Sequence, residues 1–188
     1  MAEKTTPDTL KKFGAEFQAK CIACMLGDKG FIERIYDILS AEYFESDANK
    51  WLVGQIMEYF VEYKSVPTLQ VFKIKLDQIE DSDRTKVLKT SIVEQLRYVF
   101  THIDAADKEF IKETFLEFCC NQKMKAAVLE STELLVLGQY DEIKKLVDAA
   151  LKAGMERNLG RNKQKWLIFK QPKIVKNVNK AEFVNLLI

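Results

Sequence analysis

Residues 16–69 decide the fold and read EFQAKCIACMLGDKGFIERIYDILSAEYFESDANKWLVGQIMEYFVEYKSVPTL. Apolar side chains recur in this stretch every three or four positions, the spacing that places them on one face of an α-helix. Three helices are predicted, because Asp28-Lys29-Gly30 breaks the first apolar run and a connection over residues 40–45 breaks the second. Asp47 is the predicted N-cap of the third helix. Val66-Pro67 ends that helix, because a proline pushes the residue before it into an extended conformation.

The same spacing continues downstream and predicts four more helices. Thr68 is expected to cap the first of these, and the others are expected at 82 or 83 to 101, at 107–137 and at 140–153. Gly138 suits the left-handed residue that closes a helix, and Gly154 is expected to end the last one. Because only Gly138 and Gln139 separate the last two helices, these are predicted to form an antiparallel hairpin.

The composition supports an all-α fold. The 188 residues include 7 glycines and 3 prolines, too few turn-formers for a many-stranded protein. We expect a compact helical domain over residues 8–104, a long-helix hairpin over 105–154 and a basic C-terminal tail over 155–188. The hairpin is richer in apolar residues than an exposed pair of helices should be, so it is expected to pack on a second copy or another partner. The residues predicted for this self-association are Phe115, Phe118, Leu129, Leu146 and Leu151.

Residues 16–69 resemble the N-terminal domain of DnaB-type replicative DNA helicases. The resemblance rests on the opening helix, the acidic-glycine break, the pattern I-x-x-I-L-S-x-E-Y-F at 35–44, the aromatic-rich helix and the VP turn. The pieces EYFES (42–46) and EYKSVP (62–67) are especially similar to the T-even phage version. The long helix and hairpin at 108–153 fit the same family, so the similarity extends over residues 10–153.

The resemblance implies a scaffold in DNA replication. In that family the N-terminal domains pair through their hairpins into a trimer of dimers, form a collar, recruit primase and support a RecA-type ATPase motor. The motor needs a phosphate-binding loop G-x-x-x-x-G-K-[ST], and this chain contains none, since Gly154 to Gly160 is followed by Arg161-Asn162. The chain is therefore expected to be non-catalytic by itself, with no cofactor.

The cysteines and the histidine are interpreted as structural. Cys21-Ile-Ala-Cys24 together with Cys119-Cys120 could be a four-thiolate zinc site, but Cys21 and Cys24 fall on the apolar face of a helix, where cysteine acts as a small hydrophobe. Adjacent cysteines on one helix also diverge by about 100°. His102 is the single histidine and is placed at the end of the fifth helix. Core packing is therefore predicted for the thiols and no metal site.

Two aromatic groups are interpreted differently. Helical spacing favours core packing for Trp51, Tyr59, Phe60 and Tyr63. In the tail, residues 157–181 hold eight basic residues and no acidic one. Trp166 and Phe169 lie among these basic residues. Aromatic side chains among cations are typical of single-stranded nucleic acid binding. The two aromatic residues could equally well dock back on the protein. The candidate nucleic-acid-binding residues are Arg161, Lys163, Lys165, Trp166, Phe169 and Lys170.

The expected partners are a second copy in a dimer or hexameric collar, primase and, through the tail, single-stranded DNA. No apolar run approaches the length needed to span a bilayer, so no membrane association is expected and the cytoplasm of a phage-infected bacterium is the expected location. The alternatives are a free-standing adaptor, such as a helicase loader or decoy with this fold, and a single-stranded DNA-binding protein acting through its tail.

Overall fold

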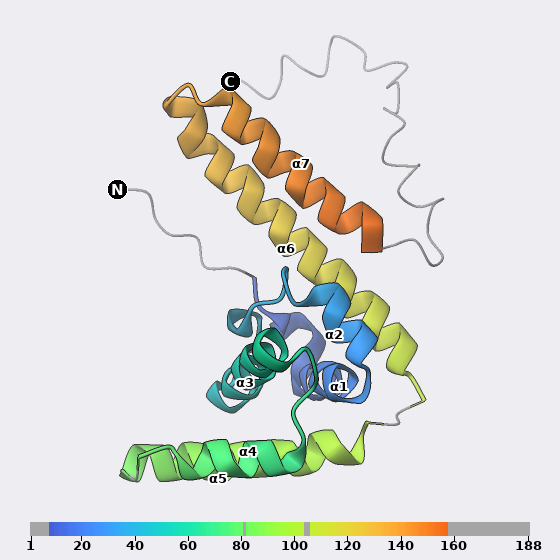
Figure 1. Ribbon diagram of the computed structural model, residues 1–188, viewed down its shortest axis with the longest axis vertical. Coiled ribbons are helices and arrows are strands. Elements are labelled where there is room, and N and C mark those ends of the chain that lie inside the picture. The colour runs from blue at the N-terminus through green and yellow to red at the C-terminus, as the bar shows by residue number, and fades with distance from the viewer. Residues whose placement is uncertain (1–7, 81, 104–105, 158–188) are drawn as a thin grey trace, which may run out of the picture. The chain divides into compact units, whose positions relative to one another are not determined.

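The computed structural model describes residues 8–80, 82–103 and 106–157, and the regular structure within them is helical, which confirms the predicted all-α fold (Figure 1). Residues 8–154 belong to one compact unit. The elements, in chain order, are η1 (Leu10–Phe13), α1 (Gly14–Gly27), α2 (Lys29–Ile35), η2 (Ala41–Tyr43), α3 (Asp47–Tyr63), α4 (Leu69–Asp77), α5 (Asp83–Thr101), α6 (Lys108–Val136) and α7 (Tyr140–Arg157).

Side-chain caps fix where several helices begin. Asp28, placed in the predicted break, accepts a hydrogen bond from the Phe31 backbone N–H at 3.2 Å and so opens α2. Ser82 opens α5 through a reciprocal pair of bonds with Thr85. The cap predicted for the third helix was wrong by one residue. Ser46 is the N-cap of α3, because its hydroxyl accepts from the Asn49 N–H at 3.1 Å, and Asp47 is the first helical residue.

Two glycines were predicted to end the last two helices, and only one of them does. Gly138 has φ +69°, which confirms that it closes α6 in the left-handed conformation open to glycine. Gly154 was predicted to end α7, but the helix continues to Arg157. A glycine weakens a helix by only about 1 kcal/mol, so it does not by itself end one.

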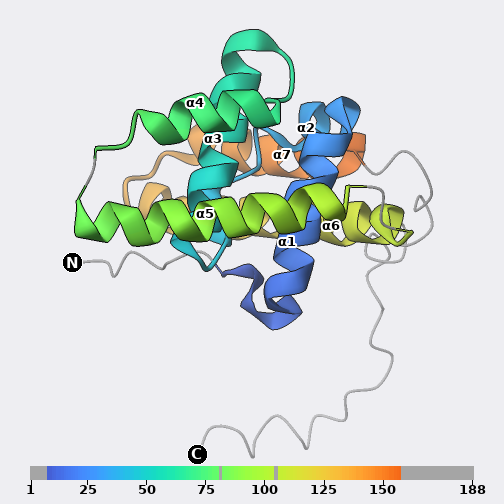
Figure 2. The ribbon, with the colours of Figure 1, turned by 90° about the horizontal axis from the view of Figure 1, so that it is seen from below.

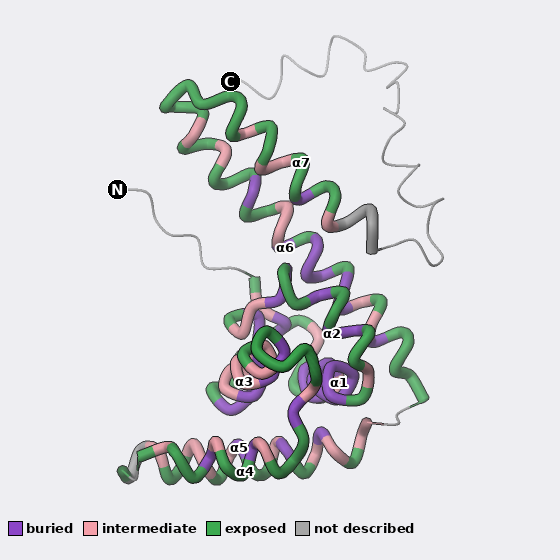
Figure 3. The backbone as a smooth tube through the Cα atoms, in the orientation of Figure 1, coloured by how far each residue is buried: buried purple, intermediate pink, exposed green. Residues whose placement is uncertain are grey.

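The core of the helical domain is built around α1, which α2, α3, α5 and α6 surround (Figures 1 and 2). Its largest fully buried side chains include Phe31, Phe44, Phe72 and Phe115, which come from α2, the segment after η2, α4 and α6. The first half of α6 therefore belongs to this core. Its second half and α7 form an antiparallel pair whose residues are mostly exposed (Figure 3).

Candidate interaction surface

Ion pairs fasten the start of α6 to the helical domain. The Lys20 ammonium on α1 lies 2.8 Å from a carboxylate oxygen of Asp107, just before α6, and Lys112 on α6 lies 2.8 Å from Asp28, the cap of α2. A hydrogen bond from Lys20 lowers the pKa of Asp107, and one from Lys112 lowers the pKa of Asp28. Both carboxylates therefore stay ionised to a lower pH than an ordinary aspartate does. The helix that leads into the hairpin is thus attached at a fixed place on the domain.

Two of the five residues predicted for self-association are buried inside the chain's own core. Phe115 is fully buried, with ring centroids 6.4 Å from Phe31 and 5.8 Å from Phe44. Phe118 is also buried and meets the Tyr43 ring edge-on at 5.3 Å. The prediction that these phenylalanines contact a partner is therefore wrong, because helices of the same chain already cover them. Periodicity shows which side chains share a face but not what covers that face.

The other predicted residues lie on the hairpin beyond the core. Leu129 and Leu151 are exposed, whereas Leu146 is partly buried and lines a shallow groove between α6 and α7 with Leu134. Among residues 123–153, all of which the structure describes, the buried ones are Ala127 and Ala150. The hairpin therefore buries small side chains at its seam and keeps its larger ones half covered.

An apolar stripe runs along the outer face of α6 and was not predicted as a unit. We call it the α6 stripe. Its members, with their exposed fractions, are Val128 (53%), Leu129 (39%), Leu135 (56%) and Val136 (88%). The first and third, and the second and fourth, are seven residues apart, so all four lie within roughly a third of the helix circumference. The buried Ala127 and the groove-lining Leu134 point to a different side of α6, towards α7. Spacing of this kind in the sequence could have revealed the stripe.

The predicted structural role of two cysteines is confirmed. Cys21 and Cys24 are buried on α1, and burial raises the pKa of both thiols, that of Cys24 to about 11. Neutral thiols in an apolar setting pack as small hydrophobes. Cys119 and Cys120 are buried as well. Within the described part of the chain, no group of three or more His, Cys, Asp and Glu side chains is placed to hold a metal ion.

His102 also lies where it was predicted, as the C-cap of α5. Its Nδ1 is 2.7 Å from the Tyr98 carbonyl oxygen, and its ring stacks on the Tyr98 ring at 4.1 Å. These contacts lie at the C-terminal end of α5. The Thr101 hydroxyl lies 3.0 Å from the same ring nitrogen, so the polar contacts of the imidazole are with groups in the last turn of α5.

The aromatic residues of α3 divide between core and surface. Phe60 is buried and Trp51 packs on Phe72 with centroids 6.3 Å apart, as the core interpretation predicts. That interpretation is wrong for Tyr63, whose side chain is exposed next to the partly buried Tyr59, with the two centroids 4.5 Å apart. Tyr63 is the last residue of α3, and its side chain is 57% exposed.

The candidate nucleic-acid-binding residues of the tail, from Arg161 to Lys170, lie outside the described residues. Among the residues that are described, no helix combines the length and the apolar character needed to cross a bilayer. No family model, no curated protein and no solved structure matches this chain. Among the described residues, the α6 stripe is a group of exposed apolar side chains gathered on one face of a helix.

Proposed function

We propose that the chain is a non-catalytic scaffold domain of a phage replicative helicase, which self-associates through the outer face of α6 and docks primase. The observation that carries the proposal is the α6 stripe: four apolar side chains stand on one face of a projecting hairpin and remain 39–88% exposed. Exposed apolar side chains gathered on one face, rather than scattered singly, mark interaction sites. The resemblance of residues 10–153 to DnaB-type N-terminal domains supports a second copy as the occupant.

The hairpin's own packing favours the same conclusion. Helical hairpins are stabilised mainly by burying an apolar face, and this one buries the side chains of Ala127 and Ala150 beyond the core. Fully burying a valine or leucine side chain stabilises a complex by roughly 1.5–3 kcal/mol. Two stripes packed against each other would cover eight such half-exposed side chains. We expect this gain to exceed the free-energy cost of association, so that a dimer forms at micromolar concentrations.

Light scattering at tens of micromolar protein tests self-association. We expect a dimer or a larger assembly for the native chain and a monomer for Leu135→Asp, because dimerisation would then bury an unpaired carboxylate. Val87→Asp is the matched control, since Val87 is 69% exposed on α5, away from the hairpin. We expect it to leave the assembly unchanged. A strictly monomeric native chain, or equal dissociation by both variants, would contradict the proposal.

Primase docking and the absence of catalysis need separate measurements. We expect the purified primase of the same phage to co-elute with the native chain and with Val87→Asp. We also expect no ATP hydrolysis above background, because the sequence contains no phosphate-binding loop. A hydrolysis rate that follows the protein through purification and changes with mutation would overturn the non-catalytic assignment.

A further inference from the structure

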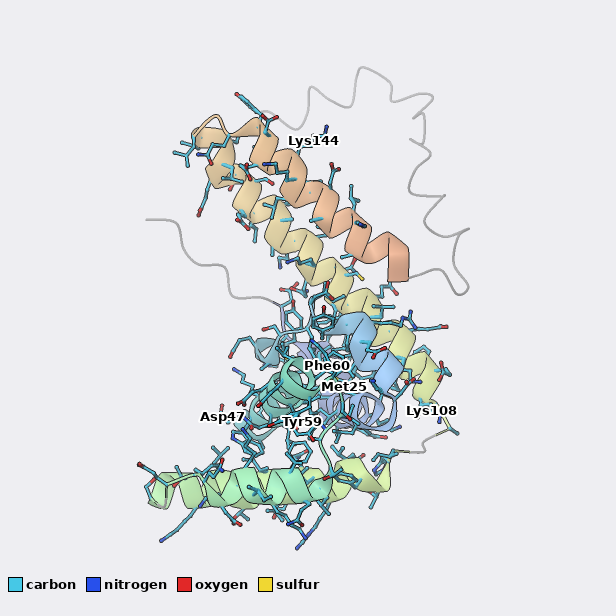
Figure 4. The ribbon with its side chains drawn as sticks, viewed as in Figure 1. Met25, Asp47, Tyr59, Phe60, Lys108 and Lys144 are labelled. Carbon is cyan, nitrogen blue, oxygen red and sulfur yellow. The ribbon has the colours of Figure 1, made fainter. Side chains whose placement is uncertain are left out.

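A second surface, distant in sequence from the α6 stripe, lies between α3 and α4. The C-terminal half of α3 and the middle of α4 enclose a groove of about 370 Å³. One wall is made by Tyr59 and Tyr63, and the other by Val71 and Ile74. Figure 4 shows Tyr59 between α3 and the pair formed by α4 and α5, whereas its neighbour Phe60 lies within the domain. Exposed Ile74 and Tyr63 leave this groove uncovered in the chain as described.

Polar groups at the groove give it a definite chemistry. The Oε1 atom of Gln55, which lines it, is buried and has no hydrogen-bond donor among the described residues. Glu58 is paired with Lys75 across the groove at 3.3 Å. Glu62 pairs with no cation in the described part of the chain, and its carboxylate accepts a hydrogen bond from the Tyr63 hydroxyl. The groove therefore offers one unsatisfied acceptor, one uncompensated carboxylate and two neighbouring tyrosine rings.

We infer that this groove binds an arginine side chain carried by an apolar segment of a partner protein. A guanidinium presents several donors in one plane and stacks favourably on aromatic rings. Glu62 would accept a charge-assisted hydrogen bond from the guanidinium. The Gln55 side-chain oxygen is buried, so its amide would rotate about the last side-chain torsion and then accept a second hydrogen bond from the guanidinium. The aliphatic stem and neighbouring apolar residues would lie along Val71 and Ile74. A lone apolar occupant would leave the Gln55 oxygen without a donor.

Fluorescence anisotropy with a labelled synthetic peptide of leucine, alanine and arginine tests the inference on the full chain. The matched peptide replaces each arginine by citrulline, which keeps the shape and removes the charge. We expect saturable binding of the arginine peptide and a Kd at least about tenfold higher for the citrulline peptide, equivalent to about 1.4 kcal/mol. Equal affinity for the two peptides would overturn the inference in favour of an apolar occupant.

The variant Glu62→Gln locates the binding. We expect it to raise the Kd of the arginine peptide at least about tenfold, whereas Glu94→Gln, an exposed carboxylate on α5 outside the groove, should leave it unchanged. Both substitutions are at exposed positions, so both proteins should fold. Equal weakening by the two variants would mean diffuse attraction to an acidic domain and would overturn the inference. Because neither variant alters the α6 stripe, the oligomeric state is expected to stay constant throughout.

Discussion

The substitution Phe115→Ala tests whether Phe115 is a core residue or an interface residue. Phe115 is fully buried within one chain, between Phe31 and Phe44. Replacing a buried phenylalanine with alanine costs about 3–5 kcal/mol, because the removed ring leaves a cavity that neighbouring side chains fill only partly. Two aromatic contacts are lost with the ring, so we expect a value in the upper half of this range. The substitution should lower the free energy of unfolding of each chain and leave the association of two chains unchanged.

Urea unfolding followed by far-ultraviolet circular dichroism measures the change. All variants are compared at one protein concentration, because a dimer's apparent stability depends on concentration. In a thermal scan of the same variants, the expected destabilisation of a chain of this size lowers the melting temperature by roughly 10 °C. Phe110→Ala is the matched control, since Phe110 lies on the same helix, five residues earlier, and is 67% exposed. It should change stability by less than about 0.5 kcal/mol.

The opposite result would refute the reasoning. If Phe115→Ala left the unfolding midpoint unchanged but dissociated the assembly, Phe115 would be an interface residue, as its place on the long helix alone had indicated. If Phe110→Ala were as destabilising as Phe115→Ala, the division of α6 into a buried and an exposed face would be wrong.

Two further predictions concern the ends of helices. The Lys112 ammonium lowers the pKa of Asp28 below the ordinary value of 3.8. The pair therefore stabilises the fold above that value, and this stability is lost as the pH falls through the lowered pKa. We expect Asp28→Asn to be up to about 1 kcal/mol less stable than the native chain at neutral pH and equally stable in strong acid; a difference that persists in acid would contradict the ion-pair explanation. Gly138→Ala should lower the free energy of unfolding by about 1 kcal/mol, because φ is +69° there. Gly54→Ala is the contrasting substitution within α3, where an added Cβ meets nothing within 4 Å. It should raise the free energy of unfolding by about 0.5 kcal/mol. Chemical denaturation of both glycine variants tests this, and equal effects would contradict the assigned conformations.

Much of the helical architecture was predictable from the sequence, because local spacing and capping residues determine it. The break at Asp28, the cap at Ser82 and the left-handed Gly138 all follow from rules that involve only neighbouring residues. Small errors arose where two residues could serve the same purpose, as Ser46 and Asp47 could at the start of α3. The end of α7 was wrongly predicted at Gly154, because a glycine ends a helix only where the backbone also leaves the helical conformation.

The interaction surfaces were harder to predict, because burial depends on elements far away in the sequence. Phe115 and Leu135 have the same apolar character on the same helix, but α2 and the segment after η2 cover only the first. The groove between α3 and α4 depends on how two helices cross, which no local pattern encodes. Tyr63 illustrates this point, since its spacing matched that of the buried Phe60 while its position near the end of α3 left it exposed.

The reactivity of a thiol placed in the α6 stripe tests the central claim most directly. Burial raises the pKa of the native Cys21 and Cys24 thiols, and all four native cysteines are buried, so they should react slowly with a thiol reagent at neutral pH. In Val136→Cys the new thiol is exposed in a single chain. We expect its reaction rate to fall severalfold between protein concentrations well below and well above the dimer Kd, while the rate for Val87→Cys stays constant. A rate for Val136→Cys that does not change across a concentration range in which dimers form would contradict self-association through the α6 stripe.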